Sequence, residues 1–155
     1  MELRKLDNND IPDLLRLLDE CKDYLIPRDE FTYVVLIRYF PSLCKAIFLE
    51  GSLVGYVGGF AAPTCASYLW QLGVSPAKRG KGLATQLLVD FIHESRRLGL
   101  GSVEFSVEPE NEVALRTFKS FANSEKITME KMDRVSYEKP DGGRTVCDDF
   151  YRYVL

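Results

Sequence analysis

The sequence predicts an α/β fold in which helices flank a mixed, mostly antiparallel central sheet. Two observations support this prediction. The chain has 155 residues, with 46% hydrophobic and 28% charged side chains, which suits one compact domain around one core. Its segments alternate between strand-like and helix-like patterns in the order strand, helices, strands, and then two strand–helix units before a closing strand. We therefore expect residues 1–155 to form a single domain.

The first forty residues predict one strand and two helices. Residues 2–6 alternate polar and apolar side chains, as a half-buried strand does. The polar run 7–9 then offers N-caps for a helix. The apolar side chains of that helix recur at helical spacing and are Ile11, Leu14, Leu15, Leu17 and Leu18. A second helix is expected at 29–40.

The middle of the chain predicts three strands followed by a helix. Residues 44–50 and 53–61 have strand composition and are separated by Glu50, Gly51 and Ser52, which predicts a hairpin. A further strand is expected at 67–74, and residues 75–81 form a loop. The following helix is expected to bury an apolar face made of Leu83, Leu87, Leu88, Phe91, Ile92 and Leu98.

The last third predicts a strand at 102–108, a helix at about 110–121 and a closing strand at 150–155. Within 102–108 the apolar side chains Val103, Phe105 and Val107 alternate with the polar ones, so the two sets take opposite faces. The stretch 127–149 is polar and has no clear period. No element is assigned to it.

Composition limits the partners that we expect. The net charge of −3 gives no extended basic surface for nucleic acid or anionic lipid. No segment has the length of a membrane span, and the N-terminus lacks the apolar core of a signal peptide. The four cysteines form no CxxC pair, so no metal site is expected. We expect a cytoplasmic protein that binds neither nucleic acid nor membranes.

The segment from Val74 to Ala84 is the most informative one, because it joins a strand end to a helix start through a basic turn with two glycines. Gly80 and Gly82 let the backbone approach a ligand closely, and the first helical turn leaves N–H groups unpaired. Such a turn binds phosphate. The spacing fits neither a Walker A loop, which needs an earlier glycine, nor a GxGxxG dinucleotide loop, which needs a third one. An ordinary basic turn that caps a helix is the alternative.

The run Arg79-Gly80-Lys81-Gly82-Leu83-Ala84 resembles the pyrophosphate-binding signature of the GNAT acetyltransferases. A second segment, which begins at Asn111 and ends at Phe118, resembles the Asn-containing helix start of the same family. The resemblance implies acetyl-CoA as cosubstrate and the family's mixed sheet. It also implies coenzyme contacts from Leu72, Val74, Arg79, Gly80, Lys81, Gly82, Leu83, Ala84 and Asn111.

Phe118 stands where many family members carry a tyrosine that protonates the leaving thiolate. A phenylalanine cannot donate that proton, and Tyr137, Tyr151 or Tyr153 are the alternatives. A closer resemblance, carried by residues 69–74, 79–84 and 104–111, is to the L-2,4-diaminobutyrate acetyltransferases, which share this phenylalanine. The N-terminal half fits that subfamily less well, because residues 26–31 replace its acid- and Asn-Ser-containing segment.

Acetyl transfer requires a neutral amine, and an alkylamine with a pKa of about 10.4 pays roughly 4.6 kcal/mol to become neutral at pH 7. A base or a water relay is therefore expected. Glu104 is the first candidate, because strand alternation places it with Ser106 on a polar face, and Glu108 is the second. The alternative for Glu104 is an ordinary ion pair. Trp70 is expected in the core or against the substrate.

The backbone N–H of Val74 is expected to stabilise the charge that develops on the thioester oxygen. The predicted function is acetyl-CoA-dependent N-acetylation of a small primary amine, for which the subfamily implies a diamino acid such as L-2,4-diaminobutyrate. A polyamine, an aminoglycoside or a protein N-terminus are alternative acceptors. A non-catalytic coenzyme-binding module is the alternative from another functional class. A homodimer is compatible with the chain.

Overall fold

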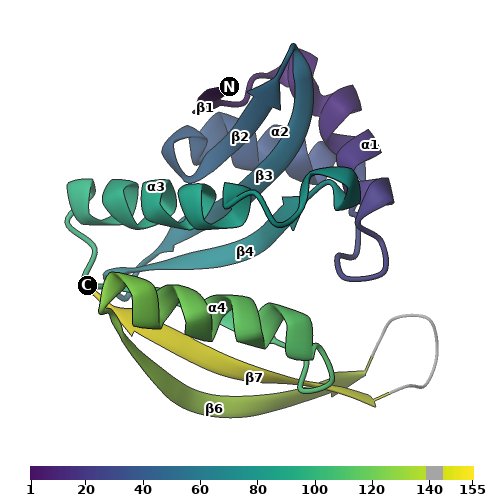
Figure 1. The fold of residues 1–155 in the computed structure, drawn as a ribbon. Helices are drawn as coiled ribbons and strands as arrows, with labels where there is room; N and C mark the ends of the chain where they lie inside the picture. The colour runs from purple at the N-terminus through teal and green to yellow at the C-terminus, as the bar shows by residue number, and fades with distance from the viewer. Residues whose placement is uncertain (139–144) are drawn as a thin grey trace.

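One mixed sheet organises the chain, with its strands in the order β1-β2-β3-β4-β5-β7-β6 (Figure 1). The computed structural model describes residues 1–138 and 145–155, and the elements below are those of the described residues. The strands are β1 (Glu2–Lys5), β2 (Cys44–Leu49), β3 (Ser52–Ala62), β4 (Ala66–Val74), β5 (Ser102–Val107), β6 (Thr128–Glu138) and β7 (Thr145–Val154). The helices are α1 (Ile11–Glu20), α2 (Glu30–Tyr39), α3 (Leu83–Arg97) and α4 (Glu112–Glu125).

The sheet is mostly antiparallel, as the sequence predicts. Within the described strands, β4 and β5 are the parallel pair, and the other neighbouring strands pair antiparallel. The crossover between β4 and β5 is α3, which is the connection that a parallel pair requires. The predicted α/β architecture is confirmed.

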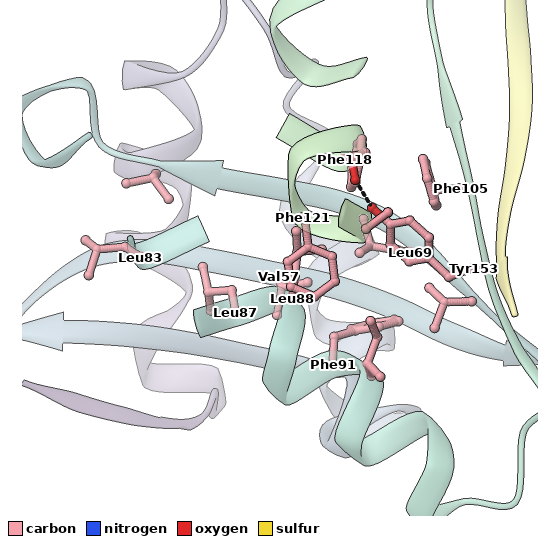
Figure 2. Packing of buried hydrophobic residues seen from close by; sticks show 14 of the residues in the cluster. Val57, Leu69, Leu83, Leu87, Leu88, Phe91, Phe105, Phe118, Phe121 and Tyr153 are labelled. Carbon is pink, nitrogen blue, oxygen red and sulfur yellow. Dashed lines mark hydrogen bonds between the residues drawn. The ribbon is translucent and has the colours of Figure 1, made fainter. Parts of the chain in front are cut away.

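Each face of the sheet carries its own hydrophobic core. α1 and α2 bury one cluster, to which Leu14, Tyr33 and Tyr56 belong. α3 and α4 bury the other cluster on the opposite face, to which Leu87, Phe91 and Phe105 belong (Figure 1). Phe105 lies at the centre of an aromatic group in the second core, with ring centroids 4.2 Å from Phe118 and 4.8 Å from Tyr153 (Figure 2).

Three local expectations change in the structure. Asp7 caps a short 3-10 turn, Asn8–Asp10, before α1 begins at Ile11. Leu98 follows the end of α3 and is 44% exposed, so it does not belong to the apolar face of that helix. β6 occupies about half of the stretch that the sequence leaves unassigned. Its side chains are almost all exposed, which explains why no alternating pattern marks it. Positions 139–144 of that stretch lie outside the described residues.

β4 leaves β5 after only three paired positions, and this divergence shapes the site. The two strands pair from Ala66 to Tyr68 and then separate. On the other side of β4, Gly58 pairs with Gln71 and Gly59 with Leu69, so Trp70 has no partner and forms a bulge. A bulge increases the local twist and bends its strand. β4 therefore turns away from β5 and leaves one of its edges without a strand partner.

Gly59 is the position where the bulge demands the absence of a side chain. A Cβ at Gly59 would collide with the Tyr68 carbonyl oxygen and would lie 2.8 Å from the Phe91 ring. The Tyr68 backbone and the packed Phe91 ring cannot both shift to make room for an added methyl group. Gly59→Ala should therefore lower the free energy of unfolding by about 1–3 kcal/mol or more.

Gly101→Ala is the matched control, because its nearest neighbour, the Cys65 carbonyl oxygen, is 4.0 Å from the added Cβ. Urea denaturation followed by circular dichroism measures both variants. Equal stability of the two would contradict the close approach of β3 and β4 at the bulge.

Candidate active site

A cavity of about 1250 Å³ opens where β4 and β5 diverge. β4 and the end of β5 form two of its walls, and the starts of α3 and α4 and the loop between α1 and α2 also line it. The volume exceeds the few hundred cubic ångströms that drug-sized ligands occupy. The cavity therefore has room for a long ligand together with a second, smaller molecule.

The basic loop forms one end of the cavity. Gly80 and Gly82 both have a φ of +74°, a conformation that L side chains rarely adopt, and a Cβ at either one would meet no atom within 4 Å. Gly82 is the N-cap of α3 and offers no side-chain cap, so the first N–H groups of the helix remain available. The open space in front of both glycines fits a phosphate group that approaches the backbone.

Most of the basic-loop residues singled out from the sequence line this end. Those that do are Arg79, Gly80, Gly82, Leu83 and Ala84, together with Lys78. Lys81 is exposed and does not line the cavity. Within the basic loop, the positive charge on the cavity lining thus comes from the two residues that precede Gly80.

Arg79 joins the basic loop to the loop between α1 and α2. Its Nε donates a hydrogen bond to the Val74 carbonyl oxygen (3.3 Å), and its guanidinium lies 4.9 Å from the centre of the Tyr24 ring. The Cys21 thiol reaches the same carbonyl oxygen at 3.5 Å. The C-terminal end of β4 therefore has neighbours on both sides that hold its backbone in place.

The free edge of β4 presents backbone groups to the cavity. The Ser75 N–H donates to the Val54 carbonyl oxygen (2.9 Å), and hydrogen-bonded positions alternate along an antiparallel pair. The backbone N–H and C=O groups of Gly73 therefore point toward β3, whereas the N–H groups of Val74 and Leu72 point away from β3, toward the cavity. The structure thus places the two β4 residues selected from the sequence on the ligand-facing edge.

Asn111 and Phe118 place α4 against the cavity. The side-chain oxygen of Asn111 accepts a hydrogen bond from the Ala114 N–H (3.0 Å), which caps α4 at the cavity wall. Phe118 lines the cavity and stacks on Phe105. Among the tyrosines that could replace its missing hydroxyl, Tyr137 lines the cavity. Tyr151 and Tyr153 are buried in the core, where the Tyr153 hydroxyl donates to the Phe118 carbonyl oxygen (Figure 2).

Glu104 is not brought to the cavity. It pairs in register with Tyr68, at the position where β4 and β5 are still hydrogen-bonded and the cavity has not yet opened. Its carboxylate accepts a hydrogen bond from Arg152 Nη2 at 2.9 Å, and it lines a separate shallow groove. The alternation along β5 was interpreted correctly, but the polar residues that reach the cavity are Ser106 and Glu108.

The end of the cavity beside β5 and β7 is acidic. Val107 pairs with Asp149, so by continuation of the register Glu108 and Asp148 lie opposite each other on the same face. Both line the cavity, and the Tyr137 hydroxyl donates to Asp148 at 3.1 Å. Burial raises the pKa of Tyr137, and its hydrogen bond to Asp148 raises it further. Two carboxylates at one end of a cavity favour a cationic ligand.

Tyr68 and Trp70 form the middle of the β4 wall. The Tyr68 hydroxyl is 2.9 Å from Ser106 Oγ and bridges the gap between the diverging strands. Burial raises the pKa of Tyr68, and the bond to Ser106 opposes this effect. Trp70 lines the cavity and also packs on Tyr33, with ring centroids 6.0 Å apart.

Sequence reasoning did not assign Tyr68 or Gln71 to ligand binding, although both line the cavity. Tyr68 shares the face of Trp70 and could have been found by extending that alternation. Gln71 depends on contacts between distant segments. Two further observations concern the described residues as a whole: no helix is long and apolar enough to cross a bilayer, and no cluster of three or more His, Cys, Asp or Glu side chains could hold a metal ion.

Comparison with known proteins identifies relatives by sequence and by fold. The L-2,4-diaminobutyric acid acetyltransferase of Halalkalibacterium halodurans is 31% identical over 103 residues, which are 65% of this chain and 54% of that protein. The match thus spans about half the length of that relative. The enzyme of the same name from Virgibacillus pantothenticus is 28% identical over 135 residues, which are 86% of this chain and 84% of that protein.

A solved structure with a similar fold is the diaminobutyrate acetyltransferase EctA of Paenibacillus lautus, in complex with its substrate L-2,4-diaminobutyric acid and coenzyme A. It superposes with a TM-score of 0.86 at 23% identity and covers 99% of this chain and 93% of that one. The family model described as Acetyltransferase (GNAT) family matches residues 11–122, which include β4, the basic loop and the start of α4. The chain therefore belongs to the GNAT acetyltransferase family.

Proposed function

We propose that this chain is an acetyl-CoA-dependent N-acetyltransferase that acts on a primary amine of a small diamino acid such as L-2,4-diaminobutyrate. The observation that carries the proposal is the set of charged and backbone groups that line one cavity. A phosphate-compatible glycine turn follows β4, two carboxylates line the side beside β5 and β7, and β4 has a free edge that leads to the glycine turn. The names of the relatives agree with this chemistry.

The coenzyme end of the cavity suits a pyrophosphate and an extended arm. Acetyl-CoA, when bound, supplies the thioester whose acetyl group is transferred. The N–H groups at the start of α3 would hold its pyrophosphate, with charge from Lys78 and Arg79. The free N–H groups of Val74 and Leu72 would bond the arm along β4. Leu72 lies two residues farther from the basic loop than Val74, so its N–H is the better placed of the two to meet the thioester oxygen.

The acidic end would receive the acceptor amine. Glu108 and Asp148 attract an ammonium group, and one of them must then take its proton, directly or through a water molecule. We assign this role to Glu108, because it lies on β5 two residues beyond Ser106, whose hydroxyl already bridges to β4. Asp148 accepts the Tyr137 hydroxyl and is thereby held as a second contact for positive charge.

The acceptor alternatives are separated by one assay. Release of free thiol from acetyl-CoA is measured with L-2,4-diaminobutyrate, a polyamine, an aminoglycoside and a peptide N-terminus as acceptors. Highest kcat/KM with the diamino acid supports the proposal. Tight coenzyme binding without turnover on any amine would instead support a non-catalytic binding module, the alternative that Phe118 favours.

The coenzyme assignment predicts a difference between two glycines of the same helix. Gly82 and Gly99 lie at opposite ends of α3, both have a φ of +74°, and a Cβ at either meets no atom within 4 Å. Alanine at either position therefore introduces a similar backbone strain of about 1–2 kcal/mol. Gly82→Ala should weaken acetyl-CoA binding by roughly 10- to 100-fold, because its methyl group would stand where the pyrophosphate approaches.

Gly99→Ala should bind the coenzyme as wild type does, because Gly99 does not line the cavity. Isothermal titration calorimetry with acetyl-CoA measures both variants. Equal affinities would remove the basic loop from the coenzyme site.

The base assignment predicts a difference between two glutamates of the same strand. Glu108→Gln keeps the size of the side chain but removes its proton affinity, so kcat/KM at pH 7 should fall by about 10²–10⁴. Raising the pH to about 9 should restore part of the loss, because more of the acceptor is then neutral.

Glu104→Gln is the matched control and should remain within about threefold of wild type, since its partner is Arg152 outside the cavity. The measurement is a kcat/KM profile from about pH 6 to pH 10 for the three proteins. A large loss in Glu104→Gln with a normal Glu108→Gln would reverse the assignment.

A further inference from the structure

A buried hydrogen-bond chain fixes the loop that precedes α2 to the wall of the cavity. The Arg28 N–H donates to the Tyr33 hydroxyl (3.1 Å), which in turn donates to Gln71 Oε1 (3.3 Å). Gln71 Nε2 donates to the Ile26 carbonyl oxygen (3.0 Å). Tyr33 is 0% exposed and Gln71 is 5% exposed, so the two side chains in the middle of the chain are shielded from water. The backbone from Ile26 to Arg28 is therefore held against β4 at a fixed position.

This anchoring places the side chain of Arg28 on the cavity lining at the acidic end. Burial raises the pKa of Tyr137, the hydrogen bond and charge of Asp148 and the charge of Glu108 raise it further, and Arg28 lowers it, so Arg28 lies near the same phenol as the two carboxylates. Within residues 1–138 and 145–155, no carboxylate forms a salt bridge with Arg28. Among the described residues, Arg28 thus brings a guanidinium to the cavity lining near the Tyr137 phenol.

The neighbouring acid does not neutralise Arg28. Asp29 is the N-cap of α2, where its side chain accepts from the Thr32 N–H (3.2 Å) and from the Thr32 hydroxyl (2.9 Å). These hydrogen bonds to Thr32 lower the pKa of Asp29. The guanidinium remains exposed at the cavity wall and has five N–H donors for a ligand.

We propose that Arg28 binds the α-carboxylate of the acceptor and makes the site selective for diamino acids over diamines that lack a carboxylate. The inference rests on the acetyl transfer proposed above. A guanidinium and a carboxylate form a two-bonded, charge-assisted pair, whereas a simple diamine carries only positive charge and is repelled by Arg28. Glu108 and Asp148 then take the two amino groups of the acceptor, so each charge of a diamino acid meets its opposite.

The test compares L-2,4-diaminobutyrate with 1,3-diaminopropane, which is the same molecule without its carboxylate. Wild type should prefer the amino acid in kcat/KM. Arg28→Ala should reduce that preference by about 10- to 100-fold, mainly through a higher KM for the amino acid. Arg28→Lys should restore part of the preference, because it keeps the charge but loses the planar fork.

Lys22→Ala is the matched control. Lys22 lies in the same loop and also lines the cavity, but its ammonium pairs with Asp19 at 3.5 Å, outside the acidic end. Its removal should leave the preference between the two acceptors unchanged. An equal loss of preference in Lys22→Ala and Arg28→Ala would mean that only the overall charge matters, which would overturn the specific role of Arg28.

Calorimetric binding of both acceptors to wild type and Arg28→Ala, with coenzyme A present, separates the two proposals. If wild type turns over neither compound but binds the amino acid more tightly, and Arg28→Ala loses this difference, the carboxylate site stands and the proposed reaction fails. If wild type does not distinguish the two compounds, or Arg28→Ala keeps the full preference, the role of Arg28 is overturned whether or not acetyl transfer occurs.

Discussion

The separation of β4 from β5 is the constraint on which the rest of the site depends. Three paired positions hold the strands together at Tyr68 and before it, and the bulge at Trp70 then turns β4 away. The separation frees the backbone groups of Leu72 and Val74, which no side chain could replace with equal rigidity. It also requires a residue without a side chain at Gly59, where β3 approaches the bulge. A single backbone irregularity thus creates both the cavity and its ligand-facing edge.

The cavity lining carries groups of charges of opposite sign although the chain as a whole is acidic. Lys78 and Arg79 stand at the glycine turn, and Glu108 and Asp148 stand beside β5 and β7. The loop between α1 and α2 contributes to both parts of the lining. Tyr24 packs against Arg79 near the turn, and the segment at Arg28 is tied to β4 through the side chains of Tyr33 and Gln71. A change in this loop would therefore affect the basic and the acidic parts of the cavity together.

Phe118 belongs both to the hydrophobic core and to the cavity lining. Its ring lines the cavity and stacks on Phe105, and the Tyr153 hydroxyl donates to its backbone oxygen (Figure 2). Burial raises the pKa of Tyr153, which keeps that phenol protonated but also keeps it inside the core. The phenols on the cavity lining are instead Tyr24, Tyr68 and Tyr137 within the described residues. The hydroxyl groups that reach the cavity from tyrosines of the described residues thus come from elements other than α4.

The sequence by itself determined the features that depend on local backbone chemistry. Strand alternation, helix caps and the spacing of Gly80 and Gly82 act over a few residues, so the order of elements and the phosphate-compatible turn were predictable. The tertiary structure decided which polar side chains meet in the cavity. Glu104 and Glu108 share one face of β5. Glu104 lies where β4 and β5 are still paired and forms an ion pair with Arg152, whereas Glu108 lies beyond the point where β4 leaves β5 and lines the cavity. Arg28 is held at the cavity by hydrogen bonds that run through Tyr33 to Gln71, which is far away in the sequence. No local sequence pattern predicts such a contact.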